Sequence, residues 1–399
     1  MTSRPPVIPV ARPLMGDEEV EAAARAIRSG WITQGPEVAS FEREFAAFVG
    51  APHACAVSSA TTALHLALLA VGVGPGDEVV TVSHSFIATA NVVRYCGALP
   101  VFVDIEPGTF NIDPTRIEAV LSPRTRAILC VHQMGMPSDL AAIAAIAHRR
   151  GIALVEDAAC AAGSEILWEG RWDRIGRPHG DIACFSFHPR KLVATGDGGM
   201  LTTANADWDA RLRLLRQHGM NVSDTARHAS PTVIFESYPV LGYNYRMTDI
   251  QAAVGREQMK RLPVVLERRR GLARRYFDGL AGLPGLRLPV EPAWARSNWQ
   301  SFCVRLANGL DQRAVMQRLL DEGISPRRGV MCAHREASYP VGTWTCRPQG
   351  RDCGCGPGVC RRLAESERAQ DQGIILPLFH QLTHADQDRV IAALRSACA

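Results

Sequence analysis

"FSFHPRKLVATGDGG", residues 185–199, places one lysine, Lys191, between a proline–arginine pair and a cluster of glycines. Proline lacks a backbone N–H, and glycine weakens both helices and strands, so the lysine cannot lie within either. The glycines at 196–199 also allow positive φ and close approach of the backbone to a ligand. The stretch therefore predicts a lysine held on a constrained loop. Other residues of the chain should then show what this lysine binds or does.

Around this loop, short apolar runs alternate with amphipathic stretches from about residue 40 to residue 260. Apolar runs without alternation are typical of strands buried on both faces, and the spacing is that of βαβ units. We therefore expect an α/β fold, with a large domain over residues 1–260 that holds a mainly parallel sheet flanked by helices. The expected strands are 77–82, 100–105, 125–132 and 152–159; the expected helices are 86–96, 138–151 (capped by Ser138 or Asp139 and ended by Gly151) and one begun by Pro114.

The pattern changes after residue 260, and a chain of 399 residues is long enough for two domains. We expect a smaller C-terminal α/β domain over residues 261–399, with which the first ~30 residues can pack. Its expected elements are a long helix at 255–281, a strand at 301–306 and helices at 311–322 and 384–397. The arginines at 268–270 and 274–275 predict one solvated face of the long helix.

The overall composition excludes several classes of protein. Hydrophobic residues make up 47% and charged residues 21%, so a disordered chain is not expected. The net charge is +4 with both signs interspersed, so we expect no nucleic-acid partner. No apolar run approaches the ~18 residues of a membrane span, and prolines interrupt the N-terminal stretch where a secretory signal would be apolar. We expect a cytoplasmic protein with no membrane partner. Six cysteines predict small buried thiols: Cys55, Cys96, Cys130, Cys160, Cys184 and Cys303.

Polar residues stand at several strand ends, where open α/β sheets bind their ligands. Asp157 ends an apolar strand, and a buried carboxylate there is costly without a cation beside it. Thr61 and Thr62 open a strong helical pattern, and the free N–H groups of a helix start suit phosphate. Ser186 lies five residues before the lysine, and Phe86 follows a strand.

One cofactor requires all of these groups together, namely pyridoxal 5′-phosphate. Its aldehyde needs a lysine amine, its pyridine nitrogen needs a carboxylate, its phosphate needs donors, and its ring needs a stacking surface. Each residue alone has a simpler explanation, as a solvated lysine, a helix cap or a core ring. The order and character of the whole set favour the cofactor. A Rossmann oxidoreductase is disfavoured, because no G-x-G-x-x-G follows the first strand.

The same residues stand in longer motifs, and with these the chain resembles the DegT/DnrJ/EryC1/StrS family of sugar aminotransferases, which depend on pyridoxal phosphate and have the type I aminotransferase fold. The similarity runs from residues 29–50 to residues 376–394. The strongest motifs are "SSATTALHLAL" (58–68), "VEDAA" (155–159), the lysine stretch and "LGYNYRMTDIQAAVG" (241–255).

The resemblance implies roles for individual residues. Lys191 binds the cofactor aldehyde and then shuttles protons, Asp157 pairs with the pyridine nitrogen, and Phe86 packs against the ring. The phosphate-binding group is Thr61, the backbone around Ala60 and Thr62, and the Ser186 hydroxyl. Two positions depart from the family, because Cys160 replaces a frequent Gln or His and Ala60 a frequent Gly.

The resemblance also implies a partner and substrate contacts. Asn244 is similar to an asparagine that reaches the phosphate of the neighbouring subunit, which implies a homodimer with shared active sites. Arg246 and Arg327 are candidates for the anionic groups of the substrates, since guanidinium suits carboxylate and phosphate, although each could equally form a structural ion pair. His334 falls in a segment similar to one that lines the site, and a surface histidine or one with satisfied hydrogen bonds is the alternative there.

The function implied is transfer of an amino group, from L-glutamate, to the keto group of a nucleotide-linked sugar by a ping-pong mechanism. Lys191 stands where the dehydratase branch of the family has His, which favours transamination. Two alternatives remain open: an aminotransferase for a keto-cyclitol or another non-sugar keto compound, and a non-catalytic scaffold or sensor with the same fold.

A Cys-rich segment at 341–360 resembles an insertion relative to the family. Its four cysteines, Cys346, Cys353, Cys355 and Cys360, could hold a structural zinc ion. The spacing C-x6-C-x-C-x4-C is not the usual pair of C-x2-C units, so a loop of reduced or partly paired thiols, or a site for another metal, remains open.

Overall fold

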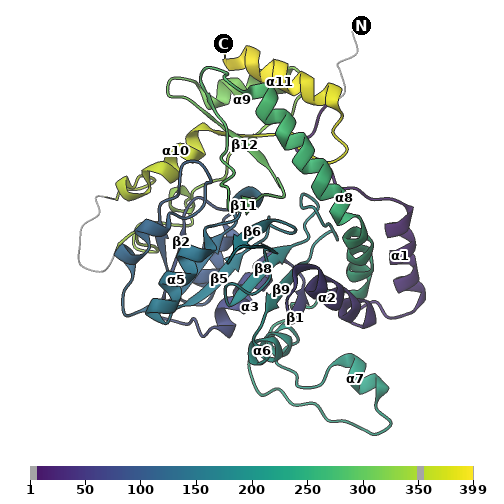
Figure 1. Ribbon diagram of the computed structural model, residues 1–399. Coiled ribbons are helices and arrows are strands. Elements are labelled where there is room, and N and C mark those ends of the chain that lie inside the picture. Colours follow the sequence, from purple (N-terminus) through teal and green to yellow (C-terminus); the bar gives the residue numbers. More distant parts are fainter. Residues whose placement is uncertain (1–6, 348–354, 399) are drawn as a thin grey trace.

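The computed structural model describes residues 7–347 and 355–398. Its centre is a seven-stranded sheet in the order β1-β9-β8-β5-β4-β2-β3 (Figure 1). The strands β2, β3, β4, β5 and β8 run parallel, whereas β9 runs antiparallel to both β1 and β8. The expected mainly parallel sheet is confirmed. The bounds are β1 (His53–Val57), β2 (Glu78–Val82), β3 (Leu99–Val103), β4 (Thr125–Val131), β5 (Ala153–Asp157), β8 (Ile182–Ser186) and β9 (Gly199–Thr203).

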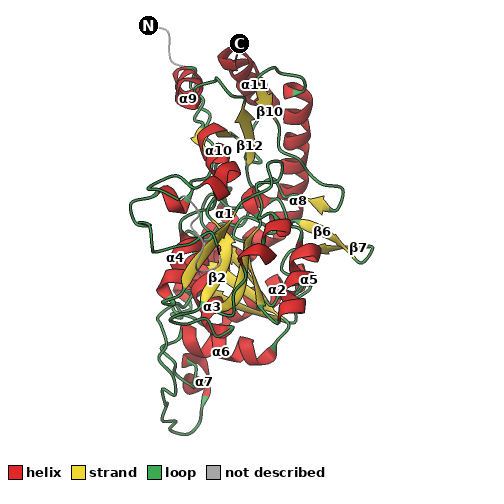
Figure 2. Ribbon diagram, turned by 90° about the vertical axis from the view of Figure 1, so that its left-hand side faces the viewer, coloured by secondary structure: helices red, strands yellow, loops and turns green. Residues whose placement is uncertain are grey.

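Helices cover both faces of this sheet (Figure 2). One face packs against α2 (Pro36–Val49), α5 (Leu140–Arg150) and α8 (Asp249–Leu280), and the other packs against α3 (Ala60–Ala70), α4 (Ala88–Tyr95) and α6 (Ala206–Arg216). Side chains alternate between the two layers along each strand. The core therefore has two apolar layers, one on each side of a sheet that is buried on both faces.

The capping residues explain where α5 begins and ends. The Asp139 carboxylate accepts a hydrogen bond from the N–H of Ala142 at 3.0 Å, whereas Ser138 donates its hydroxyl to the carbonyl of Val131. Asp139 is therefore the N-cap, and Gly151 ends the helix in the left-handed region with φ of 62°.

The helix expected from Pro114 was wrong. The chain forms only two 3₁₀ turns there, Pro114–Arg116 and Glu118–Val120. A second proline, Pro123, follows closely, and the residue before a proline is disfavoured in the helical region. The stretch between the two prolines is too short for a stable α-helix.

The second part of the chain forms a four-stranded sheet in the order β10-β12-β14-β13, with α8 running alongside it toward the larger sheet (Figure 1). Residue 260 lies within α8, and Ile8 bridges to Ile324 in the C-terminal part. The division into domains at 260 stays a prediction. The elements are β10 (Leu286–Arg287), β12 (Phe302–Leu306), β13 (Arg327–Arg328), β14 (Gly373–Leu376), α9 (Gln312–Asp321), α10 (Ala364–Gln372) and α11 (His384–Cys398); α1 (Asp17–Arg28) packs on α8.

The expectation that residues 268–270 share one solvated face was wrong for Arg269. Its side chain is buried and donates to the backbone carbonyls of Trp299 and Gln300 at 2.9 and 2.7 Å. Successive residues of a helix point about 100° apart, so a run of three cannot occupy one face. Burial lowers the pKa of the Arg269 guanidinium to about 9.

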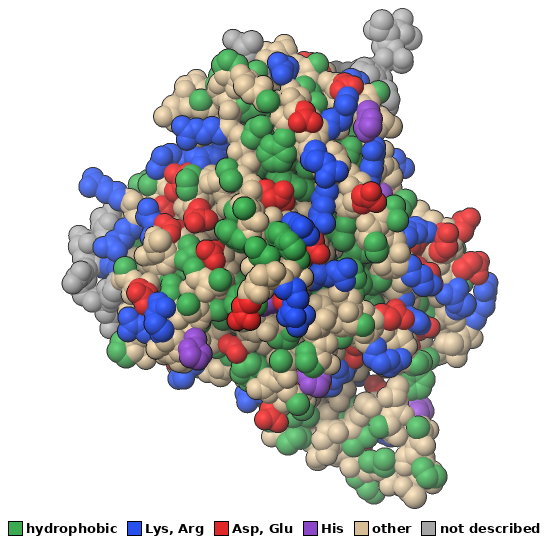
Figure 3. All heavy atoms as spheres, viewed as in Figure 1, with side chains coloured by type: hydrophobic (Ala, Val, Ile, Leu, Met, Phe, Trp, Pro, Cys, Tyr) green, Lys and Arg blue, Asp and Glu red, His purple; other side chains and the backbone are tan. Residues whose placement is uncertain are grey.

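Two further features lie at the surface. A small sheet, β11 (Ala295–Arg296), β6 (Glu165–Trp168) and β7 (Arg171–Arg174), joins the two parts of the chain, and a segment with α7 (Asp224–Ala229) projects from the body at the bottom of Figure 1. Basic and acidic side chains are interspersed over the face drawn in Figure 3. Among the described helices, none is both long and apolar enough to cross a membrane.

Candidate active site

A cavity of about 680 Å³ opens at the carboxyl ends of the parallel strands. Its walls are the start of α3, the turns that follow β2, β4, β5 and β8, and segments from the C-terminal part, including β13 and residues 375–378. Residues Val10 and Ala11 close another side. Parallel strands present their carboxyl ends at one edge of a sheet, so residues far apart in sequence meet there.

Lys191 lies in the loop between β8 and β9, as expected, and its amine faces this cavity. The loop is closed by backbone hydrogen bonds from Phe187 to Gly198 at 2.8 Å and from Thr195 to Phe187 at 2.9 Å. The Lys191 amine Nζ lies 2.9 Å from Sγ of Cys160. The half-buried amine is therefore positioned and restrained, unlike a solvated lysine.

Asp157 is the last residue of β5, and its buried carboxylate reaches the same cavity. One oxygen accepts from the Thr89 hydroxyl at 2.7 Å and the other from the N–H of Ala159 at 3.2 Å. Burial raises the pKa of Asp157, while these two hydrogen bonds and the positive charge of Lys191 oppose the rise. A cation bound against this carboxylate would remove the cost of its burial.

His132, which was not among the residues predicted from the sequence, lines the cavity directly after β4. Its Nε2 donates to the buried carboxylate of Glu156 at 2.9 Å, and its Nδ1 accepts from the N–H of Ser138 at 3.0 Å. These two partners fix the imidazole ring and place its proton on Nε2. The position after a predicted strand could have indicated it, but the pairing with Glu156 could not be read from the sequence.

The start of α3, where an anion site is expected, lies at the cavity. Ser59, Ala60 and Thr61 line the cavity, but Thr62 does not. The Thr62 hydroxyl completes a capping box, donating to the Ser59 carbonyl at 2.8 Å and accepting from the Ser59 N–H at 3.1 Å. The cap therefore uses the Thr62 side chain, and the hydroxyl and N–H of Thr61 remain for a ligand.

Gly199 lets the start of β9 lie directly against this helix start. A Cβ at residue 199 would stand 2.4 Å from the Ser59 carbonyl oxygen and 2.8 Å from the Ala60 nitrogen. Ser186, at the end of β8, also lines the cavity.

The remaining predicted residues divide into those at the cavity and those away from it. Phe86 lines it and is 61% exposed, and Arg327 lines it from β13 together with Arg328. Asn244 is exposed and Arg246 forms an ion pair with Asp224 at 3.0 Å; neither lines the cavity of this chain.

His334 is buried and does not line the cavity either. Its Nδ1 lies 2.6 Å from the Ser83 hydroxyl and its Nε2 lies 3.1 Å from Glu367. Burial lowers the pKa of His334, against the opposing effect of Glu367. The histidine therefore has both ring nitrogens hydrogen-bonded, as one of the two alternatives held, and it is buried and not at the surface.

Comparison with known proteins shows to which family the chain belongs. Residues 13–395 match the DegT/DnrJ/EryC1/StrS aminotransferase family. The spore coat polysaccharide biosynthesis protein SpsC of Bacillus subtilis (strain 168) is 40% identical over 318 residues, which cover 79% of this chain and 80% of that protein.

Two solved structures have the same fold along nearly the whole chain. S. venezuelae DesV, in complex with a ketimine intermediate, has 35% identity and a TM-score of 0.84, covering 96% of this chain and 94% of that one. DesI, in the presence of its TDP-sugar product, has 30% identity and a TM-score of 0.83, covering 99% and 94%.

The fold is that of a pyridoxal-phosphate-dependent aminotransferase. The chain belongs to the DegT/DnrJ/EryC1/StrS aminotransferase family. Its own residues fit the cofactor: an amine, a buried carboxylate without a full cationic partner and an open helix start share one cavity, whose volume is ordinary for a ligand site.

A second cluster lies apart from this cavity. The sulfur atoms of Cys346, Cys355 and Cys360 all lie within 4.8 Å of one another. Cys353, the fourth cysteine of the predicted zinc site, lies outside the described residues. The zinc ion therefore stays a prediction.

Proposed function

We propose that the protein transfers an amino group from L-glutamate to the keto group of a nucleotide-linked sugar, in two half-reactions at one site. The observation that carries the proposal is the single cavity shared by the Lys191 amine, the Asp157 carboxylate and the helix start at Thr61. The choice of substrate class is supported by similarity to DesI, which was solved with its TDP-sugar product.

Each group of the cavity has a distinct task in this proposal. Pyridoxal 5′-phosphate, when bound, supplies an aldehyde for the substrate amine and a ring that accepts electrons. Nζ of Lys191 accepts the α-proton of the donor and later returns a proton to the acceptor carbon. Asp157 holds a proton on the pyridine nitrogen, and Phe86 supports the ring. Thr61, Ser186 and the backbone of Ala60 bind phosphate.

The same cavity serves both substrates in turn, because one lysine serves both half-reactions. This arrangement supports ping-pong kinetics, in which the first product leaves before the second substrate binds. Arg327 lies at the wall contributed by β13, and within the described part of the chain no carboxylate forms an ion pair with it. We propose that it binds an anionic group of donor or acceptor.

An acceptor assay tests the proposed substrate. With glutamate as donor, 2-oxoglutarate release is expected to be at least ~10-fold faster with a nucleotide-linked keto sugar than with the same sugar unlinked, because binding energy from the remote nucleotide lowers the barrier.

Arg327→Met is expected to raise KM for a substrate that it contacts, while Arg313→Met, on the exposed side of α9, leaves KM unchanged. Faster reaction with a keto-cyclitol would favour the alternative substrate class. Absence of turnover with any acceptor, together with absence of cofactor binding, would favour a scaffold.

We also propose that the protein is a homodimer in which Asn244 reaches the neighbouring subunit's phosphate site. The projecting segment that contains α7 supports this proposal. It exposes Val233, Phe235, Tyr238 and Leu241, with Phe235 90% and Leu241 86% exposed in the single chain. Exposed apolar side chains gathered on one segment are typical of an interaction surface.

Charged substitutions on this segment test the dimer. The double variant Phe235→Glu, Leu241→Glu is expected to sediment as a monomer and to lose activity, because Asn244 lies on the same segment. Leu320→Glu, an exposed position on α9, is the matched control and is expected to remain a dimer. A dimer that persists in the double variant would contradict this use of the segment.

A further inference from the structure

The segment between residues 339 and 363 brings three sulfur atoms together. Sγ of Cys355 lies 3.4 Å from that of Cys346 and 2.9 Å from that of Cys360, and the third separation is 3.5 Å. In a tetrahedral site with Zn–S of about 2.3 Å the sulfur atoms stand about 3.8 Å apart. Small outward shifts of the three sulfur atoms would therefore accommodate the ion.

We propose that, in the reduced protein, Cys346, Cys355 and Cys360 are ligands of a structural zinc ion. Cys346 and Cys360 are free thiols, whereas Cys355 takes part in a disulfide. A thiol reductant must first reduce that disulfide. It donates two electrons and two protons to the disulfide and is itself oxidised to a disulfide. Zinc then replaces one proton on each of the three thiols.

The cluster is shielded from solvent. Cys346 and Cys360 are 1% and 0% exposed. Hydrogen bonds from outer groups orient the ligands of a metal site. Thiolate ligands and a closed, buried position are typical of structural zinc.

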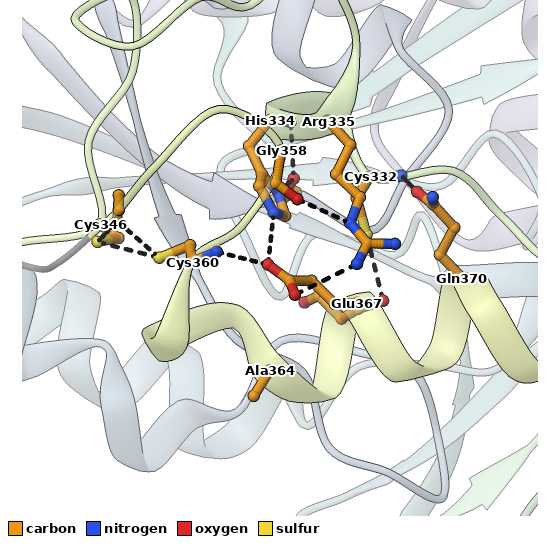
Figure 4. Close-up of polar contacts among 12 residues, drawn as sticks. Cys332, His334, Arg335, Cys346, Gly358, Cys360, Ala364, Glu367 and Gln370 are labelled. Carbon is orange, nitrogen blue, oxygen red and sulfur yellow. Dashed lines mark hydrogen bonds and ion pairs between the residues drawn. The ribbon is translucent and has the colours of Figure 1, made fainter. Parts of the chain in front are cut away.

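A polar network holds the loop that carries Cys360 (Figure 4). The N–H of Cys360 donates to Oε1 of Glu367 at 2.5 Å, and His334 and Arg335 contact the same carboxylate at 3.1 and 3.3 Å. Arg335 also donates to the carbonyl of Gly358 at 3.2 Å. The loop is therefore fixed against α10 and the turn at 333–335.

The cluster also covers the edge of the main sheet. Thr345 pairs with β3, accepting from the N–H of Phe102 at 2.7 Å and donating to the carbonyl of Pro100 at 3.0 Å. Cys346 and Cys360 pack in one apolar cluster with Phe102, Tyr339 and Trp344. β3 would otherwise leave an unpaired edge, and a metal ion that closes this segment would protect it.

The contacts continue to the wall of the active site. His334, held by Glu367, also bonds to Ser83, which directly follows β2, and Ile87 packs against the cysteine cluster. Phe86, which lines the cavity, lies between these two residues in sequence. The cysteine cluster is therefore a support for the turn at 83–87. The proposal does not depend on which substrate the enzyme takes.

Metal analysis of the full-length holoenzyme, purified with dithiothreitol, tests the site. About one zinc ion per chain is expected, and X-ray absorption at the zinc edge is expected to give a sulfur shell near 2.3 Å. Cys346→Ser and Cys360→Ser are expected to lose most of the zinc and to unfold at a lower temperature. Cys398→Ser, a half-buried cysteine in α11, is the control and keeps the zinc.

Three results would overturn the proposal. The first is a reduced wild-type protein without metal, even after zinc is added. The second is a metal surrounded only by nitrogen and oxygen at about 2.0–2.1 Å. The third is full zinc content in both cysteine variants. The absorption measurement uses only the wild type, so it remains decisive if a variant fails to fold.

Discussion

Replacing Lys191 with alanine is expected to lower kcat by about 10²–10⁴-fold, the usual contribution of a positioned acid–base side chain. The Lys191 amine is the group at the cavity that we propose to move the α-proton. Steady-state kinetics with glutamate and an active acceptor measure the effect. Added methylamine is expected to restore part of the rate, because it replaces the missing base.

The sequence offers a matched control, since the chain has only two lysines, Lys191 and Lys260. Lys260 is exposed on α8 and pairs with Glu257 at 2.6 Å. Lys260→Ala is expected to keep the wild-type kcat. A Lys191→Ala variant that retained wild-type turnover would contradict the proposed role of this amine.

Replacing Asp157 with asparagine is expected to lower kcat by on the order of 10²-fold or more, the size of losing one preorganised electrostatic contact. The amide fits the same space, because it can accept from the N–H of Ala159 and donate to the Thr89 hydroxyl. It removes only the charge that holds a proton on the pyridine nitrogen. Kinetics and the absorption spectrum of the bound cofactor measure the loss.

The same substitution is expected to stabilise the cofactor-free protein at neutral pH. Burial raises the pKa of Asp157 in the folded state, so the folded state binds this proton more tightly than the unfolded state. The stability that the protonated Asp157 side chain contributes is fully present below the unfolded-state pKa of about 3.9. It is lost as the pH rises through the pKa of the folded state.

Thermal unfolding of the cofactor-free protein measures this effect. At pH 7 the Asp157→Asn variant is expected to unfold at a higher temperature than the wild type, because it carries no buried charge. Thr89→Val, which removes a hydrogen bond to the carboxylate, is expected to shift the melting temperature in the opposite direction. A lower melting temperature for Asp157→Asn would contradict this prediction. It would show that the protein itself already balances the charge of the Asp157 carboxylate when no cofactor is bound.

Much of the fold could be predicted because its determinants are local. The parallel strands are continuous apolar runs, and the glycines around Lys191 mark a loop that the structure confirms. Gly151 likewise ends α5 in the left-handed region, as glycine permits. The 3₁₀ turns after Pro114 were missed because a proline can begin a helix, but the next proline left too little chain to continue it.

The parts that could not be predicted depend on contacts between distant residues. His132 gains its fixed orientation from Glu156, and Arg269 is buried because two carbonyls at Trp299 and Gln300 turn toward it. The Thr62 hydroxyl could serve either a cap or a ligand, and only the geometry of the helix start decides for the cap. Sequence spacing carries no information on such choices.

The most direct test of the central claim is to locate the cofactor's covalent attachment. The purified protein is incubated with pyridoxal 5′-phosphate, reduced with borohydride, digested and analysed by mass spectrometry. The added cofactor mass is expected on the peptide that contains Lys191 and not on the peptide that contains Lys260. A protein that binds no cofactor, or that carries it only at Lys260, would contradict the account.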